Sequence, residues 1–317
     1  MDCDDRRVRI GCISLAMRVL VTGSNGYVGH QIASRLASGG WTVVGSTRRP
    51  YSLEGIDVAC GDHLDTGFVT SIVEQCDAVV HCAARTRGHS AEVFRRDNEL
   101  VTAMLCREAQ RLDKRFIYVS SDQAVHQTGF YGKSKRACEE IVAAEHSNFT
   151  VLRLTVVLGR YAPEMASTLS RIIKRLHDGP VLVVPGDCQF PVAPVWIGDI
   201  EQVLRRLLAL DELPGDVFEL CGPALSLSSL IDLFEQRLGV RRLRLRLPLR
   251  PLQATARMLK PHKLFERLPL DALLDLGAPI RVSFDKLARA LDFEPTDMGR
   301  AVAQIEGFPL ESADSRL

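Results

Sequence analysis

The chain has 317 residues, of which 46% are hydrophobic and 25% are charged, and its formal net charge is +1. These values are typical of a globular protein with one large α/β unit and a smaller region, or with two domains. They exclude a strong global field that would favour nucleic acid or a membrane surface as the main partner.

The first part of the chain predicts strands that alternate with helices. The strands are apolar along their whole length, which is typical of a parallel sheet covered on both faces. We therefore expect an α/β fold with a doubly wound parallel sheet of the Rossmann type. The predicted strands are 19–23, 41–46, 77–84, 115–121 and 149–159, and the predicted helices are 29–40, 68–76, 99–112 and 133–146.

Beyond about residue 160 prolines become frequent and the pattern loosens, with a further strand at 217–222 and a helix after it. We interpret residues 17–185 as a dinucleotide-binding domain. Residues 186–317 then form mainly a smaller substrate-binding region, with strands returning to the sheet. Residues 1–16 are separate in character, with mixed charges and a short apolar part, and we expect an N-terminal extension rather than a signal peptide.

Two further features bear on compartment and metal content. No apolar run reaches the ~18 residues of a membrane span, so no transmembrane segment is expected. The nine cysteines form no CxxC pair and no metal-ligand spacing, which indicates structural thiols in a reducing, cytoplasmic compartment and no metal site.

A glycine-rich turn joins the first strand to the first helix. Gly23, Gly26 and Gly29 have G-x-x-G-x-x-G spacing in "VTGSNGYVGH". Glycines there permit a tight turn and close backbone approach, and the helix start offers free N–H groups and partial positive charge to a pyrophosphate. This predicts a dinucleotide site that also includes Asn25, Tyr27 and Val28.

The end of the second strand indicates which dinucleotide binds. An NAD site usually carries an acidic residue there for the ribose 2′-hydroxyl. This chain instead has Arg48 and Arg49 in "GSTRRP". Guanidinium groups suit a 2′-phosphate, so NADP is favoured over NAD, which stays open. The alternative is that these arginines are solvated surface charges.

Taken together, the motifs of this chain resemble those of the extended short-chain dehydrogenase/reductase family, which includes nucleotide-sugar epimerases and dehydratases. The resemblance covers nearly the whole chain after Met17. The matching pieces run in family order: "TGSNGYVG" (22–29), "GDHLD" (61–65), "VVHCAA" (79–84), "DNELVTAML" (97–105), "VSS" (119–121), "YGKSK" (131–135), "LRLTVVLG" (152–159), "VWIGDI" (195–200), "FELCGP" (218–223) and "FDKLARALDFEP" (284–295).

The resemblance implies roles for residues outside the glycine turn. Asp62 would bind the adenine amino group, and Ala83 and Ala84 would line the nicotinamide ribose. Asn98 would support a helix kink and a water that relays protons. Tyr131 would be the acid/base, and Lys135 would bind the ribose and lower the pKa of Tyr131.

The spacing of Tyr131 and Lys135 supports their pairing. Residues four apart share one helix face, so both can address one cofactor. A free tyrosine titrates near ~10, and moving its pKa to about 7 requires roughly 4 kcal/mol. One cation ~4 Å away supplies about that much at an effective dielectric constant of ~20. One lysine would therefore be sufficient.

The third catalytic position is ambiguous. Ser121 is the best hydroxyl, whereas counting from the strand could place Asp122 there, and a carboxylate cannot donate a hydrogen bond unless it is protonated. Ser120 and Ser121 could also be ordinary strand-end residues. Val156 stands where many sugar-nucleotide epimerases carry a substrate-binding asparagine, which argues against a strict epimerase and leaves open reduction of a 4-keto sugar nucleotide or of another ketone.

Residues 241–267 hold nine Lys/Arg against one Glu. In "RLRLRL" a strand would place arginines on one face and leucines on the other. The stretch could be a solvated basic face around a core-packing stripe, a contact for the substrate diphosphate, or a surface for an anionic membrane or a partner protein.

These patterns predict an NADP(H)-dependent oxidoreductase that transfers a hydride at a C–OH/C=O carbon, with catalytic residues Ser121, Tyr131, Lys135 and Asn98. By resemblance the substrate is a nucleotide sugar, reduced at a 4-keto group or epimerised, and a homodimer is allowed. The alternative is a non-catalytic NADP-binding subunit or sensor. The sequence leaves open the substrate, the direction of reaction and the oligomeric state.

Overall fold

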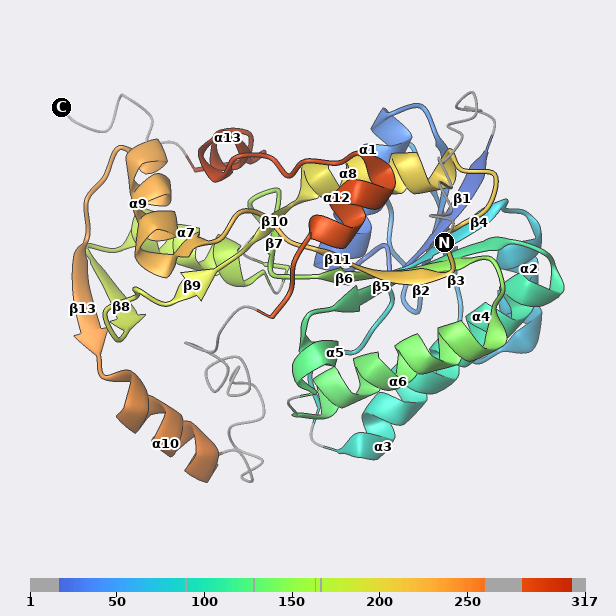
Figure 1. The fold of residues 1–317 in the computed structure, drawn as a ribbon, viewed down its shortest axis with the longest axis horizontal. Coiled ribbons are helices and arrows are strands. Elements are labelled where there is room, and N and C mark those ends of the chain that lie inside the picture. Colours follow the sequence, from blue (N-terminus) through green and yellow to red (C-terminus); the bar gives the residue numbers. More distant parts are fainter. Residues whose placement is uncertain are drawn as a thin grey trace, which may run out of the picture.

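The computed structural model describes residues 17–88, 90–127, 129–162, 164–165, 167–259 and 281–309. Its centre is a parallel sheet of seven strands in the order β11-β6-β5-β4-β1-β2-β3 (Figure 1). The strands are β1 (Arg18–Thr22), β2 (Thr42–Thr47), β3 (Asp57–Cys60), β4 (Ala78–His81), β5 (Arg115–Ser121), β6 (Phe149–Leu154) and β11 (Asp216–Leu220). This confirms the predicted doubly wound parallel sheet.

Helices cover both faces of the sheet. One face packs against α1 (Tyr27–Ser38), α8 (Ile197–Leu208) and α12 (Asp285–Leu291). The other packs against α2 (Thr66–Glu74), α4 (Val101–Arg111) and α6 (Gly129–Glu145).

The central strand β1 shows why its sequence is apolar throughout. Val19 and Val21 join the α1 side of the core, while Leu20 joins the α2 side, and all three side chains are fully buried. Successive side chains of a strand point to opposite faces, so a strand buried on both faces needs apolar residues at every position.

The chain reverses its winding direction at β1, because β2 lies on one side of it and β4 on the other. Ligands of such sheets bind outside the carboxyl ends of the strands at this switch point. The turn after β1, the residues after β4 and the end of β5 therefore meet at one edge of the sheet.

A smaller region has its own core beside the sheet, formed by α7 (Thr168–Asp178), β8 (Val181–Pro185), α9 (Leu227–Leu238) and α13 (Met298–Ala303), with β13 (Leu243–Leu247) paired to β8. The remaining elements are short or peripheral: α3 (Ala91–Phe94), η1 (Arg95–Leu100), α5 (Gln123–His126), β7 (Val157–Leu158), β9 (Pro191–Val192), β10 (Val195–Trp196), β12 (Leu225–Ser226) and α10 (Leu249–Leu259). Strand β11 lies in this half of the sequence yet belongs to the main sheet. The domain boundary at residue 185 stays a prediction, and the predicted extension 1–16 lies outside the described residues.

The leucines of β13 do not pack into the core, which was one of the alternatives left open by the sequence. Leu243 and Leu245 are 71% and 53% exposed, whereas Arg244 points inward. The guanidinium of Arg244 donates to Asp232 and Glu235 of α9, at 2.5 and 2.8 Å. Two carboxylates on the covering helix thus hold Arg244 inward, while Arg246 is exposed. Residues 260–267 of the basic stretch lie outside the described residues.

Within the described part of the chain, no helix is long and apolar enough to cross a membrane. Seven of the nine cysteines are described, and all seven are free thiols.

Candidate active site

The glycine turn forms a close-packed cradle between β1 and α1. A Cβ on Gly23 would lie 2.7 Å from the Cα of Ala83, and one on Gly29 would lie 2.4 Å from the carbonyl oxygen of Gly23. Gly23 also has a φ of +67°. Side chains are therefore excluded at both positions.

The N-terminus of α1 is open to a ligand. Gly26 is its N-cap, no side chain caps the helix, and its first turn holds no acidic residue. The first N–H groups of the helix and its partial positive charge can therefore be used by a phosphate. Asn25 and Gly26 are exposed, Tyr27 and Val28 are half-buried, and the Tyr27 hydroxyl donates to the carbonyl of Arg160 at 3.2 Å. The cradle fits the predicted dinucleotide.

A buried hydrogen-bond chain supports this cradle from below. The hydroxyl oxygen of Thr22 accepts from the backbone N–H groups of Cys82 and Ala83 at 3.2 and 3.1 Å, and it lies 2.7 Å from Nδ1 of His81. Since that oxygen already accepts twice, its one proton is donated to Nδ1. His81 Nε2–H then donates to Thr102, 3.0 Å away. Burial, foremost, holds the pKa of His81 well below its usual value, so the ring is neutral.

Helix α6 brings Tyr131 and Lys135 to the carboxyl end of β5. Lys135 is 2% exposed, and its ammonium donates to the carbonyl of Val119 at 2.8 Å. The ammonium nitrogen lies 5.9 Å from the centre of the Tyr131 ring. Both side chains therefore share one face of α6, as the spacing predicts.

Ser121, at the end of β5, joins this pair. It makes a hydrogen bond with the Tyr131 hydroxyl. The Ser121 hydroxyl also donates to Asp122 Oδ1 at 3.0 Å and accepts from the Gln123 N–H at 3.3 Å. Ser121, rather than Ser120, is thus placed beside the phenol, and Asp122 lies directly behind it.

The net pKa of Tyr131 is set by burial and a neighbouring carboxylate, and the lowering predicted for Lys135 stays a prediction. Burial, first, and the charge of Asp122, second, raise the pKa of Tyr131 above its ordinary value. The Lys135 ammonium is directed to the carbonyl of Val119, and burial lowers its own pKa. Tyr131 is consequently a protonated phenol.

Asn98 connects the helix that carries it to α6. It is 1% exposed and lies in η1, a π-helical segment, which agrees with the helix distortion implied by the resemblance. Its amide nitrogen donates to Ser134 at 2.9 Å and to the carbonyl of Arg85 at 3.1 Å, while its oxygen accepts from the Arg85 N–H at 2.6 Å. Asn98 therefore fixes the backbone that follows β4. The relay water stays a prediction.

The residues predicted for the adenosine end of the cofactor lie around the ends of β2 and β3. Arg48 and Arg49 are exposed, and Arg48 forms an ion pair with Asp97 at 3.2 Å. Asp62 caps its own turn by accepting from the Leu64 N–H at 3.1 Å. Ala83 and Ala84 are half-buried beside the glycine turn.

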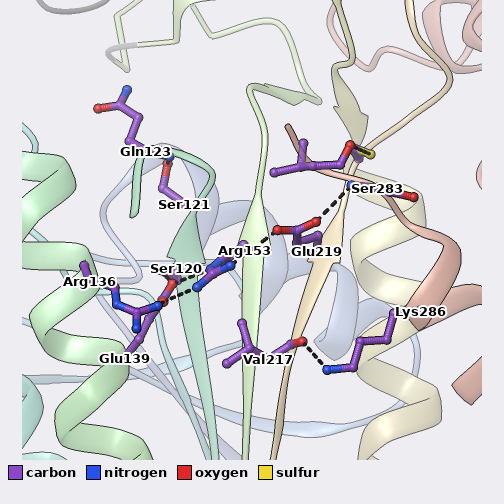
Figure 2. Close-up of polar contacts among 12 residues, drawn as sticks. Ser120, Ser121, Gln123, Arg136, Glu139, Arg153, Val217, Glu219, Ser283 and Lys286 are labelled. Carbon is purple, nitrogen blue, oxygen red and sulfur yellow. Dashed lines mark hydrogen bonds and ion pairs between the residues drawn. The ribbon is translucent and has the colours of Figure 1, made fainter. Parts of the chain in front are cut away.

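A charged network lies beside α6 (Figure 2). Glu139 accepts from Ser120 at 2.6 Å and pairs with two nitrogens of Arg153, at 2.9 and 2.7 Å. Arg153 Nη1 reaches Glu219 at 3.3 Å, and the other oxygen of Glu219 accepts from the Ser283 N–H at 2.9 Å. The network joins α6, β5, β6 and β11.

The same network accounts for Ser120. Its register partner on β6 is Arg153, whose own partner on β11 is Glu219, so all three side chains lie on one face of the sheet. Ser120 is therefore a packing residue, and Ser121 points elsewhere because successive strand residues alternate.

Several residues of the site were not predicted from the sequence: Thr22, His81, Asp97, Glu139, Arg153 and Glu219. Glu139 had a signal, since it follows Lys135 by four residues and so shares the face of Tyr131 and Lys135. Asp97 directly precedes Asn98 but had no signal of its own.

Comparison with known proteins identifies related sequences and folds. The sequence model of the NAD dependent epimerase/dehydratase family matches residues 19–221. A UDP-2-acetamido-2,6-beta-L-arabino-hexul-4-ose reductase of Pseudomonas aeruginosa is 29% identical over 202 residues, covering 61% of this chain and 50% of the relative. Methionine adenosyltransferase 2 subunit beta of Danio rerio is 25% identical over 213 residues, covering 60% and 63%. The matches thus span about half to two thirds of these curated relatives.

Solved structures share the fold. UDP-glucose 4-epimerase of Thermotoga maritima superposes with a TM-score of 0.72 at 18% identity, covering 90% of this chain and 96% of that one. dTDP-4-dehydrorhamnose reductase of Bacillus anthracis, in complex with NADP, superposes with a TM-score of 0.70 at 14% identity, covering 92% and 98%.

Proposed function

This chain belongs to the NAD-dependent epimerase/dehydratase family, and we propose that it is an NADPH-dependent reductase of a 4-keto nucleotide sugar. The observation that carries the proposal is the meeting of Ser121, Tyr131 and Lys135 at the sheet edge that also holds the glycine cradle. When bound, the nicotinamide would supply the hydride.

The protein's own residues would supply the proton and the positioning. Tyr131 donates its phenolic proton to the substrate oxygen, since a group with a raised pKa remains protonated at neutral pH and acts as a general acid. Ser121 orients the carbonyl through its hydroxyl. Lys135, held against Val119, places a positive charge beside the site where negative charge develops on oxygen.

We favour reduction over epimerisation on the name of one relative. The Pseudomonas relative is a reductase of a UDP-linked sugar by name, which supports the same direction and substrate class.

For the nucleotide part of the substrate we propose the region around β8 and β13. Val183, Leu245 and Leu247 are exposed there, and exposed apolar patches of this kind mark ligand grooves and interfaces. Arg246 and Arg250 are exposed nearby in the sequence and suit a diphosphate.

The proposal is tested by NADPH oxidation with a panel of 4-keto sugar nucleotides, for the wild type and Tyr131→Phe. We expect the rate to fall by a factor of about 10²–10⁴, the usual contribution of general acid catalysis. Tyr161→Phe is the matched control, because Tyr161 belongs to the smaller core and should leave the rate unchanged. Equal rates for wild type and Tyr131→Phe would remove Tyr131 from the mechanism.

A second candidate function is a non-catalytic NADP-binding subunit. The Danio rerio relative is named as a subunit of another enzyme, and this observation favours the candidate. Tight NADPH binding without turnover on the panel, together with a partner protein that co-purifies in fixed ratio, would select it over the reductase.

We also propose a reducing, cytoplasmic location, supported by seven free thiols among the described residues. A homodimer stays a prediction that sedimentation of the purified protein would test.

A further inference from the structure

Three charged side chains gather beside the glycine cradle. Arg85 approaches Asp97 Oδ2 with two nitrogens, Nε at 2.6 Å and Nη2 at 2.5 Å. Arg48 Nη1 lies 3.2 Å from the same oxygen. The side chain of Asp97 is 8% exposed, while those of Arg48 and Arg85 are 53% and 37% exposed. One nearly buried carboxylate thus holds two accessible guanidinium groups together.

The two arginines border the cradle from opposite sides. Arg48 directly follows β2, whose Ser46 carbonyl accepts the Gly23 N–H at 2.8 Å. Arg85 follows Ala83 by two residues, and Ala83 lies against Gly23. Strands β2 and β4 are the neighbours of β1, so both guanidinium groups project from the carboxyl edge around the turn.

The position of Arg85 is fixed from the backbone outward. Asn98 accepts its N–H and donates to its carbonyl, and Asp97, the next residue along η1, holds its side chain. Burial alone would raise the pKa of Asp97, but hydrogen bonds from Arg85 and Arg48 lower it, so the carboxylate is ionised. The arrangement is preorganised before any ligand arrives.

Counting charges shows why the second arginine matters. Arg48 and Asp97 alone sum to zero and would attract no anion. With Arg85 the three groups sum to +1, and they present several N–H donors to a phosphate, which carries roughly −1.5 to −2.

We propose that Arg85, and not the neighbouring Arg49, is the second cation of a 2′-phosphate site, and that Asp97 is its positioning carboxylate. The inference rests on the dinucleotide site of the proposed function and names the residues that select NADPH over NADH. Among the described residues no carboxylate holds the side chain of Arg49, whose contact is through its backbone carbonyl, which accepts from Thr47.

The test is the dissociation constant of NADPH and of NADH, measured by nucleotide fluorescence on the full chain, which requires no turnover. For Arg85→Met we expect NADPH to bind about tenfold more weakly or worse, the size of one lost charge-assisted hydrogen bond, with NADH within about twofold of wild type. Arg87→Met removes the same charge from an exposed position two residues on and should change neither constant.

A double variant tests the role of Asp97. In Arg85→Met the carboxylate cancels Arg48, whereas in Arg85→Met/Asp97→Asn the charge of Arg48 is released. We therefore expect NADPH binding to recover at least about threefold relative to Arg85→Met. A double variant that binds NADPH no better than Arg85→Met would overturn the charge balance assigned to Asp97 and Arg48.

Other outcomes are equally decisive. Equal weakening of NADPH and NADH by Arg85→Met, or the same NADPH loss in Arg87→Met, would overturn the assignment of Arg85. If Arg85→Met does not fold, Arg85→Lys keeps the charge but loses the forked contact, and it should still weaken NADPH selectively. A wild-type protein that binds neither nucleotide would overturn the proposed function as well, which separates the two failures.

Discussion

Replacing Asp122 with asparagine should make Tyr131 more acidic. Ser121 bonds to both residues, and two hydrogen bonds in series place the carboxylate roughly 6 Å from the phenol oxygen. At that separation and an effective dielectric constant of ~20, two charges interact by about 3 kcal/mol, or about two pKa units. Asp122 is half-buried, so solvent screening reduces the expected decrease to about one unit.

The direction of the change in the Tyr131 pKa follows from the charges of the two groups. The phenolate and the Asp122 carboxylate are both negative, so removal of the carboxylate stabilises the phenolate and lowers the pKa of Tyr131. The assay is the pH dependence of kcat for oxidation of the alcohol product by NADP, where the rate rises as the base deprotonates. In Asp122→Asn this rise should begin about one pH unit lower than in wild type.

The control is Glu140→Gln, which removes an exposed carboxylate from the same helix that carries Tyr131. Its profile should coincide with that of wild type. A profile for Asp122→Asn that stays in place, or that moves to higher pH, would refute the reasoning from charge.

Three more outcomes are expected. Burial, first, lowers the pKa of His63 to about 4, so below the unfolded value of ~6.5 the folded state binds fewer protons than the unfolded state. The free energy of unfolding should therefore fall by about 3 kcal/mol from pH 6.5 to 4. Urea titrations of His63→Gln over the same pH range should show a smaller fall. Gly29→Ala should abolish dinucleotide binding in a fluorescence titration, because its Cβ meets backbone at 2.4 Å, whereas Gly179→Ala, with contacts of 3.5 Å, should bind normally. Glu139→Gln should cost about 2–3 kcal/mol in urea unfolding, because the partly buried Arg153 loses its shorter ion pair and keeps only Glu219, whereas loss of the more exposed pair in Glu145→Gln should cost under about 1 kcal/mol; equal costs would contradict this.

The sequence predicts most of the sheet because hydrophobic pattern and local turn chemistry determine it. The strand 115–121 was predicted with the bounds of β5, and the helix and strand after the glycine turn were placed within a few residues. The four-residue strand β3 (Asp57–Cys60) was missed, because "DVAC" is too short for its alternation to stand out. The helix predicted at 99–112 begins earlier, in the π-helical η1, which no local pattern announces.

In the site, too, local sequence patterns predict some residues and not others. The loop glycines, Tyr131 and Lys135 follow from spacing within one turn or helix. The ion pair between Arg48 and Asp97 could not be predicted, since the two residues are 49 positions apart along the chain. The inward face of β13 likewise depends on acids of α9 rather than on the alternation of leucine and arginine. Contacts between distant segments decide charge and orientation, and the sequence pattern does not contain them.

The late position of β11 in the chain has a consequence for synthesis. Until Asp216–Leu220 emerge from the ribosome, the edge of β6 has no neighbour, and Arg153 has no contact with Glu219. At 5–20 residues per second, roughly 3–13 seconds separate the completion of β6 from that of its neighbour. An unpaired parallel strand with apolar residues on both faces is a template for association with other nascent chains. Chaperone dependence during translation, and aggregation of fragments that stop near residue 185, are the expected results.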